Sequence, residues 1–258
     1  MNRRPSPRTF TVLDKTEITP NMLRVTLGGE GMADFPADQP SAYVKLRFPQ
    51  AHSERPLLRT YTIRSQRDDS VDIDFVRHGD GGPAARWAED VQPGETIDIG
   101  GPGPKKRVDP AADWVLLIGD MTALPAISAN LETLPRTTSG HAIIEVLHES
   151  DIQNLDAPDG VTLQWVINPH PGQDSAPLYD AVAALDWPAG QPSVWCACEF
   201  ATMRRLREHL RGDRGVPRAA LYISSYWQNG RNEEAHKANK RADSEADQDG
   251  SDIPAKRA

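Results

Sequence analysis

Short segments of alternating apolar and polar residues fill about the first hundred positions of the chain. Residues 71–76 alternate Val, Asp, Ile, Asp and Phe, which is the period of a half-buried strand. Turn residues separate the six segments of this kind, which are residues 8–14, 22–28, 42–48, 59–64, 71–76 and 96–99. Short strands with frequent turns are typical of an antiparallel β-barrel, and we expect one here.

The pattern changes after about Pro110. A continuous apolar run at residues 114–118 begins a series in which strand candidates alternate with helical segments. The later strand candidates are residues 141–147, 161–167, 194–198 and 220–225. The helical segments are the stretch from after Thr122 to Leu134, residues 176–185 and residues 200–210. This alternation predicts an α/β domain with a mostly parallel sheet covered on both faces.

The pattern therefore predicts two domains, a barrel over residues 8–108 and an α/β domain over residues 109–242. Residues 243–258 are charged and polar with almost nothing to bury, so we expect a disordered tail. Ligands bind parallel sheets at the carboxyl ends of the strands, where Asp120, Thr122 and Glu199 are expected.

Composition excludes several classes of protein. The net charge of −8 over 258 residues argues against general nucleic-acid binding. No run approaches the roughly 20 apolar residues of a membrane helix, and the polar start of the chain does not resemble a secretory signal, so we expect no membrane insertion and a cytoplasmic location. Cys196 and Cys198 are too few for a disulfide framework, and we expect two buried small side chains.

The strand at residues 59–64 carries the first candidate chemistry. Arg59 and Tyr61 share one side of an extended segment because side chains alternate with period two. The guanidinium suits a pyrophosphate, the ring can pack on an isoalloxazine, and Thr62 can hydrogen-bond its polar edge. The alternative is an ordinary strand with solvated arginines.

A glycine-rich segment follows the next strand. Gly79 and Gly82 precede a helix with Pro83 in its first turn, and such an entry presents backbone N–H groups to an anion. The alternative is a capped surface helix whose glycines make a turn. His78 has no second His or carboxylate at metal-ligand spacing, so we expect no metal and a hydrogen-bonding role beside the flavin.

These segments together resemble the siderophore-interacting proteins, which serve iron transport and homeostasis. The resemblance runs from about Arg8 to about Lys237, and its segments are RTYTIR at 59–64, DFVRHG at 74–79, GPAARWA at 82–88, GDMTALPAI at 119–127, and YW at 226–227 with GR at 230–231. The resemblance implies a flavin-dependent ferric-siderophore reductase built on the ferredoxin–NADP reductase plan.

The resemblance also implies FAD as cofactor. It assigns cofactor binding to Arg59, Tyr61, Thr62, His78, Gly79, Gly82, Pro83, Ala84, Trp87, Asp120, Thr122 and Ala123. Tyr61 and Thr62 are the catalytic candidates, and their expected role is to tune the flavin. The reduction of iron needs no acid, base or nucleophile.

Two positions depart from the family. Met121 stands where the family usually has Glu, and Cys198 replaces the glycine of an Ala-Gly-Glu segment that ends at Glu199. A side chain at Cys198 would lie where a nicotinamide approaches, so the electron donor stays open between NAD(P)H and ferredoxin in the region of Glu199.

The expected substrate is a ferric siderophore, which holds Fe(III) through hard, usually anionic oxygen donors. Lys45 is the first candidate to meet it, since it matches the lysine of the family's Val-Lys-Leu strand; Arg55, Lys105, Lys106 and Arg231 are further candidates, with solvated surface charge as the alternative. The rival functions are a flavin oxidoreductase of the same plan acting on another acceptor, and a siderophore-binding flavoprotein without turnover. We expect a monomer.

Overall fold

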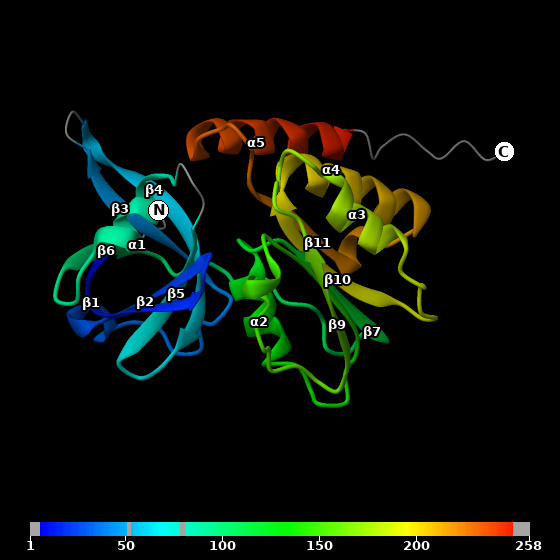
Figure 1. Cartoon of the computed structure of the whole chain (residues 1–258), viewed down its shortest axis with the longest axis horizontal. Helices are drawn as coiled ribbons and strands as arrows, with labels where there is room; N and C mark the ends of the chain where they lie inside the picture. Colours follow the sequence, from blue (N-terminus) through cyan, green and yellow to red (C-terminus); the bar gives the residue numbers. More distant parts are fainter. Residues whose placement is uncertain (1–5, 51–52, 78–80, 250–258) are drawn as a thin grey trace.

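The computed structural model describes residues 6–50, 53–77 and 81–249, which form two sheets. Figure 1 shows them side by side, and the chain passes from one to the other between Gly100 and Trp114. The predicted domain boundary at residues 108 and 109 lies in this connection. The expected fold class, an antiparallel barrel followed by an α/β domain with a parallel sheet, is confirmed.

The first sheet is a closed barrel with strand order β1-β2-β5-β4-β3-β6. Its strands are β1 (Arg8–Thr19), β2 (Met22–Gly28), β3 (Tyr43–Gln50), β4 (Ser53–Gln66), β5 (Ser70–Val76) and β6 (Thr96–Gly100). Every pair is antiparallel. The alternation seen in the sequence of β5 has the expected consequence, because Val71, Ile73 and Phe75 pack in the barrel core.

The intervening aspartates of β5 lie on its other face and pair with arginines. Asp74 contacts Arg24 at 2.6 Å, and Asp72 contacts Arg67 at 2.7 Å. Burial raises the pKa of Asp72, but hydrogen bonds from Arg67, Ser65 and Thr26 outweigh it and bring that pKa down to about 2. Both faces of the strand are therefore stabilised by specific partners.

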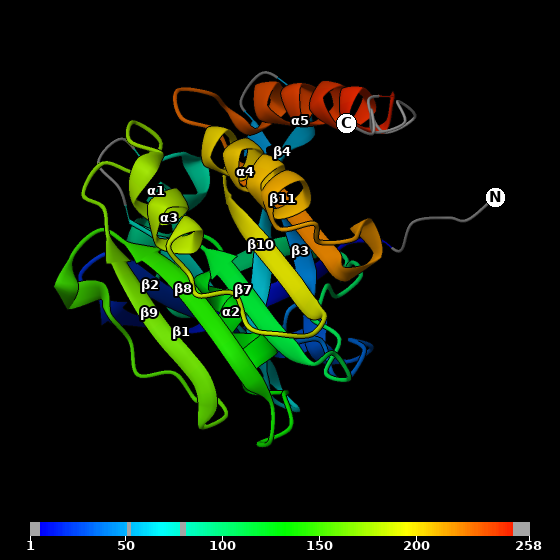
Figure 2. The same cartoon turned by 90° about the vertical axis from the view of Figure 1, so that its right-hand side faces the viewer.

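The second sheet is parallel, with strand order β11-β10-β7-β8-β9. Its strands are β7 (Trp114–Gly119), β8 (Ser139–Val146), β9 (Gly160–Ile167), β10 (Pro192–Glu199) and β11 (Leu221–Trp227). Helix α2 (Leu124–Leu131) packs on one face, and α3 (Ala176–Ala183) and α4 (Phe200–Glu208) pack on the other (Figure 2). Burial on both faces explains why β7 is apolar throughout.

One further α-helix and several single turns complete the described part of the fold. Helix α1 (Pro83–Asp90) packs Ala84, Ala88 and Trp87 against the barrel core. The remaining turns are 3-10 helices at Gly29–Met32, Glu149–Asp151 and Arg218–Ala220, and a π-helical turn at His209–Asp213. None of the helices in the described part of the chain is both long and apolar enough to cross a membrane.

Helix α5 (Glu233–Asp249) runs above both domains, from the barrel to α4 (Figure 1). The expectation of disorder from residue 243 onward is therefore wrong for residues 243–249; residues 250–258 lie outside the described ranges. The reason is electrostatic, since Asp243 contacts Arg207 at 2.6 Å and Asp247 contacts Arg211 at 2.7 Å. Composition alone does not reveal such partners.

Apolar and polar contacts join the two domains. Met22 of the barrel is fully buried and belongs to the same cluster as α2, Val108 and Tyr226. Asp151, also fully buried, accepts hydrogen bonds from Thr19 Oγ1 at 2.8 Å and from Asn21 N and Nδ2 at 3.0 and 2.8 Å. The relative position of the domains is thus set by specific contacts.

Candidate functional site

Strand β4 carries the predicted flavin residues beside β3. The register pairs Lys45 with Thr60, Val44 with Tyr61 and Leu46 with Arg59. Paired residues share a face, so Arg59 and Tyr61 lie on the side of Val44 and Leu46, and Lys45 lies with Thr60 on the other side. The predicted common face of Arg59 and Tyr61 thus agrees with the register, and Lys45 is on the opposite face of the same two strands.

Arg59 is mostly enclosed, with 14% of its side chain exposed. Its Nη1 donates to the backbone oxygen of Leu58 at 2.9 Å and to Glu234 Oε1 at 3.0 Å. The neighbouring Thr60 hydroxyl donates to Glu233 Oε1 at 3.1 Å. Both carboxylates come from the first turn of α5, a contact that the sequence gave no reason to expect.

Tyr61 is part of an aromatic cluster at one end of the barrel. Its ring centroid lies 4.4 Å from that of Phe75, which in turn lies 5.8 Å from that of Trp87; Trp87 also contacts Phe48. Burial, together with the charge of Glu233, raises the pKa of Tyr61 well above its usual value, so its hydroxyl stays neutral at physiological pH. Trp87 therefore supports Tyr61 through Phe75.

The glycine-rich segment is only partly within the described residues. His78 and Gly79 lie outside them. Gly82 forms the N-cap of α1 with Pro83 in the first turn, and a side chain at Gly82 would meet no atom of the described residues within 4 Å, its chain neighbours aside. The Ala84 side chain is buried against the barrel core, which leaves its backbone N–H as the group that could meet an anion.

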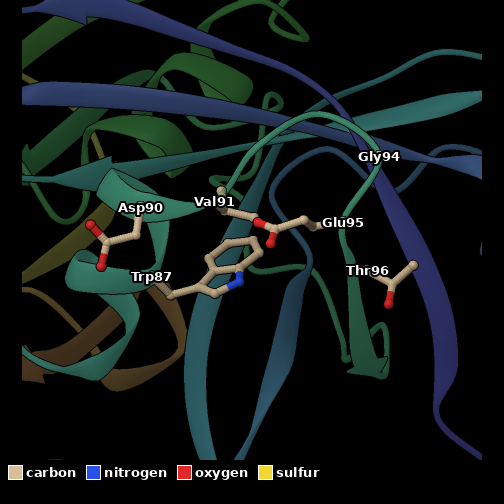
Figure 3. A pocket seen from close by; sticks show the side chains of 6 residues that line it. All are labelled: Trp87, Asp90, Val91, Gly94, Glu95 and Thr96. Atoms are coloured by element: carbon tan, nitrogen blue, oxygen red, sulfur yellow. The ribbon is translucent and has the colours of Figure 1, made fainter.

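A pocket of about 600 Å³ lies on the far side of the same helix. Trp87 and Asp90 of α1 line it together with Val91, Gly94, Glu95 and Thr96 at the start of β6 (Figure 3). Two carboxylates, from Asp90 and Glu95, make it unsuited to an anionic ligand.

Asp120, Thr122 and Ala123 form the turn from β7 into α2. Asp120 is 4% exposed and accepts hydrogen bonds from Thr122 N at 2.9 Å, Thr122 Oγ1 at 2.6 Å and Trp227 Nε1 at 2.7 Å. Burial raises the pKa of Asp120 despite these hydrogen bonds. The carboxylate thus ties the turn to the end of β11.

Tyr226 connects the turn at Asp120 to the predicted flavin strand, β4. It interacts with Thr62 of β4 and with Tyr222, and burial raises the pKa of its hydroxyl well above the usual value. The sequence marked Tyr226 and Trp227 as motif residues without assigning them a role. The structure brings them between Thr62 and Asp120, two predicted cofactor residues from different domains.

The carboxyl ends of the parallel strands form an acidic edge. Glu199 accepts from the backbone N–H groups of Ala201 at 2.5 Å, Thr202 at 3.2 Å and Asn229 at 3.1 Å, and so caps α4. Glu145 of β8 is buried, and burial with the charges of Asp120, Asp174 and Glu199 raises its pKa to about 7 against the opposing hydrogen bond from Asn168. Sequence reasoning missed Glu145, whose only signal is a carboxylate inside an apolar strand.

Cys198 does not line this edge. Its side chain is 1% exposed and packs with Cys196 in the core between the sheet, α3 and α4. The expectation that Cys198 places a side chain in the path of a nicotinamide is therefore wrong, because alternation along β10 turns it toward the helices. The expectation of two buried small side chains is confirmed.

The basic substrate candidates are dispersed. Lys45 Nζ lies 3.3 Å from Thr60 Oγ1 and 5.7 Å from the centre of the Tyr43 ring. Lys105 is paired with Asp38 at 2.6 Å. Arg55, Lys106 and Arg231 are exposed. Lys45 thus lies beside Thr60, the neighbour of Arg59 on β4.

Comparison with known proteins places this geometry in a class. The fold matches phthalate dioxygenase reductase with a TM-score of 0.63 and 16% identity, covering 88% of this chain and 70% of that one, a similarity that shows the architecture alone. A family model described as the siderophore-interacting FAD-binding domain matches residues 11–56 and 50–106. The chain is thus an FAD-binding protein of the ferredoxin reductase-like fold.

The particular family follows from the second domain and from full-length relatives. The siderophore-interacting protein model matches residues 112–230. Ferric vibriobactin reductase ViuB of Vibrio cholerae is 34% identical, covering 89% of this chain and 92% of its own. The crystal structure of SipS from Aeromonas hydrophila has a TM-score of 0.85 and 35% identity, covering 93% of this chain and 98% of its own. The chain belongs to the siderophore-interacting protein family.

The residues around β4 fit the phosphates of FAD. Arg59 and Thr60 offer donors that already hold carboxylate oxygens, which have the same charge and acceptor chemistry as phosphate oxygens. No atom of the described residues beyond its chain neighbours would contact a side chain at Gly82, so these residues leave the start of α1 accessible to an anion.

Proposed function

We propose that this protein is an FAD-dependent reductase of ferric siderophores. One electron passes to Fe(III) in the siderophore, and iron leaves as Fe(II), for which hard oxygen donors have lower affinity. The observation that carries the proposal is the full-length relationship to a protein named as a ferric vibriobactin reductase. The donor groups at Arg59 and Thr60 support it, since they suit the phosphates of the required cofactor.

We assign the residues of this chain to three roles. Arg59, His78, Gly79, Gly82, Pro83 and Ala84 bind the phosphates and adjacent atoms; Tyr61 and Thr62, with Trp87 behind them, orient and tune the ring; and Asp120, Thr122 and Ala123 close the site from the α/β domain. When bound, FAD supplies the ability to accept two electrons and deliver them singly. Tyr61 stays protonated, so its hydroxyl can donate a hydrogen bond.

Lys45 is proposed to meet the anionic siderophore complex. Its position beside Thr60, close to the flavin strand, supports this role. Arg55, Lys106 and Arg231 would contribute to the field that steers the complex in an otherwise acidic protein. Lys105 is a weaker candidate because Asp38 already holds it.

We retain NAD(P)H and ferredoxin as the two classes of electron donor, and we place the reaction in the cytoplasm with a monomeric enzyme. Size-exclusion chromatography with light scattering tests the monomer. Stopped-flow mixing of the oxidised flavoprotein with NADH, NADPH or reduced ferredoxin identifies the donor that reduces the flavin.

The central experiment isolates the step at iron. The FAD-reconstituted protein is photoreduced without oxygen and mixed with a ferric catecholate or a ferric hydroxamate siderophore, while flavin absorbance and a chromogenic Fe(II) chelator are followed. We expect the flavin to be reoxidised as Fe(II) appears. Binding of the siderophore to a flavin that stays reduced would show a non-catalytic binding protein. Reoxidation by a quinone but by neither siderophore would show an oxidoreductase of another acceptor.

A further inference from the structure

The first turn of α5 occupies the donors that the proposed function assigns to a pyrophosphate. Glu234 Oε1 lies 3.0 Å from Arg59 Nη1, and Glu233 Oε2 lies 3.7 Å from the same nitrogen. Burial opposes ionisation of Glu234, but hydrogen bonds from its own backbone N–H and from Arg59 prevail and lower its pKa. The residue is therefore anionic at neutral pH and repels any phosphate that approaches Arg59.

The remainder of α5 is held by polar contacts. Apart from alanine, its sequence contains no apolar side chain. In its middle, His236 Nε2 lies 2.8 Å from Ser225 Oγ and Lys240 Nζ donates to Ser225 O at 2.8 Å. In its last turns, Asp243 pairs with Arg204 and Arg207 of α4. Asp247 pairs with Arg211 and Arg218, which follow α4 in the chain. His236 is 4% exposed and its ring centre lies 6.3 Å from that of Phe200, so a shift confined to the first turn would leave these contacts in place and chiefly exchange ion pairs for water.

We propose that Glu233 and Glu234 are affinity determinants of the anion site at Arg59, where their carboxylates compete with the phosphates of the ligand. Binding of FAD displaces the first turn of α5 from β4, and the cost of this displacement lowers the affinity. The inference rests on the proposed function in one respect, the assignment of FAD phosphates to Arg59. It adds that a helix of the α/β domain controls access to a barrel residue.

The test is a titration of the FAD-free protein with FAD, in which quenching of the flavin fluorescence reports binding. Glu234 is 56% exposed, and ion pairs in contact with solvent contribute modestly, so we expect the double variant Glu233→Gln/Glu234→Gln to bind FAD about threefold to tenfold more tightly. The matched control is Glu245→Gln, because Glu245 lies on the same helix and pairs with Arg241 of that helix at 2.9 Å. We expect the control to leave Kd unchanged.

A second variant acts far from Arg59. Asp243→Asn/Asp247→Asn loosens the other end of α5, and it also lowers Kd for FAD if the helix competes as a unit. Hydrogen exchange gives an independent readout, and we expect the amides of the first turns of α5 to exchange faster with FAD than without it. Circular dichroism confirms that each variant is folded.

An unchanged or higher Kd in Glu233→Gln/Glu234→Gln would overturn the inference, as would slower exchange in α5 with FAD. Either result would mean that the two carboxylates leave the affinity for FAD unchanged or increase it. Failure of the proposed function is a separate outcome because no siderophore is present in this titration. Normal FAD binding with no electron transfer to ferric siderophore would defeat the function and leave the inference standing.

Discussion

Arg59 combines a permanent charge with a largely enclosed position. Its partners are the backbone oxygen of Leu58 and two carboxylates that belong to another domain. An enclosed guanidinium loses little further entropy when it binds an anion, and its planar fork matches phosphate oxygens. The residue is therefore suited to hold a cofactor once its acidic neighbours move away.

Arg59→Ala should weaken FAD binding by about 1–3 kcal/mol, the range for loss of a charged hydrogen-bond partner. Equilibrium titration of the FAD-free protein with FAD measures the change. Arg55→Ala is the control, since Arg55 is exposed on the same strand. Equal losses in both variants would point to a general effect of charge rather than to a phosphate contact.

Lys45→Ala should raise the siderophore concentration needed for half-maximal reduction while FAD occupancy and flavin reduction by the donor stay nearly unchanged. The lysine faces away from Tyr61, so its charge acts on the substrate complex and not on the ring side of the strand. Steady-state kinetics at several ionic strengths should show a weaker salt dependence than in the wild type. Arg136→Ala is the control, because this side chain of the α/β domain is 65% exposed and has no assigned role. A Lys45→Ala variant that loses flavin would exclude this role.

Glu145→Gln tests the buried acid at the end of β8. Burial raises the pKa of Glu145 from 4.5 to about 7, so the folded protein holds its proton more tightly than the unfolded chain does. The contribution of Glu145 to the free energy of unfolding therefore falls as pH rises from about 4.5 to about 7. At pH 8 the substitution should raise the free energy of unfolding by about 1–3 kcal/mol, with little change at pH 5.

Urea unfolding at the two pH values measures the effect of Glu145→Gln. The hydrogen bond from Asn168 survives, because the glutamine oxygen still accepts it. Glu208→Gln, on the exposed side of α4, should show no such pH dependence. A destabilised Glu145→Gln protein at pH 8 would mean that the carboxylate has a favourable partner there.

Among the secondary-structure elements, α5 depends most on charges outside itself. Its composition is that of a solvated segment, yet four carboxylates contact arginines at its two ends. The helix is polar on nearly all sides, and such helices form when ion pairs and a docking surface compensate for the ordering cost. Its stability should therefore respond to salt more than that of α2 or α4.

Truncation after Ala242 should destabilise the docking of α5 by about 1–2 kcal/mol, since it removes both Asp243 and Asp247. Hydrogen exchange of the amides at residues 233–242 measures the loss. Truncation after Asp249 is the control, because it keeps both carboxylates. Equal exchange in the two shortened proteins would show that the arginine contacts do not hold the helix.

The whole molecule is organised by the contact between the barrel and the parallel sheet. The predicted cofactor residues of the two domains meet where Tyr226 interacts with Thr62. Fully buried Asp151 and Met22 hold this arrangement from the other side of the interface. A small change at the interface would thus alter the site without touching a cofactor residue.

Asp151→Ala should lower the free energy of unfolding by about 1–3 kcal/mol, because the Thr19 hydroxyl and the amide groups of Asn21 would remain buried without their acceptor. Thermal unfolding measures the loss, and weaker FAD retention should accompany it. Asp156→Asn is the control at a side chain that is 57% exposed. Unchanged stability in Asp151→Ala would show that the apolar contacts alone join the domains.

The sequence by itself determined the type and order of nearly every element. Alternation along β5 and the continuous apolar run of β7 reflect burial on one face and on two faces, and that periodicity is local information. The flavin strand was predictable for the same reason, since the spacing of Arg59 and Tyr61 fixes their common side. The family and its FAD-binding domain followed from several such segments in order.

Only the tertiary structure decided which distant groups meet. The pairing of Glu234 with Arg59 joins positions 175 residues apart, and no periodicity encodes it. The same holds for the raised pKa of Glu145, which comes from burial and from the charges of Asp120, Asp174 and Glu199, and for the helical start of the predicted tail. Burial and electrostatic partnership are properties of the assembled chain, because each requires a neighbour that the local sequence does not specify.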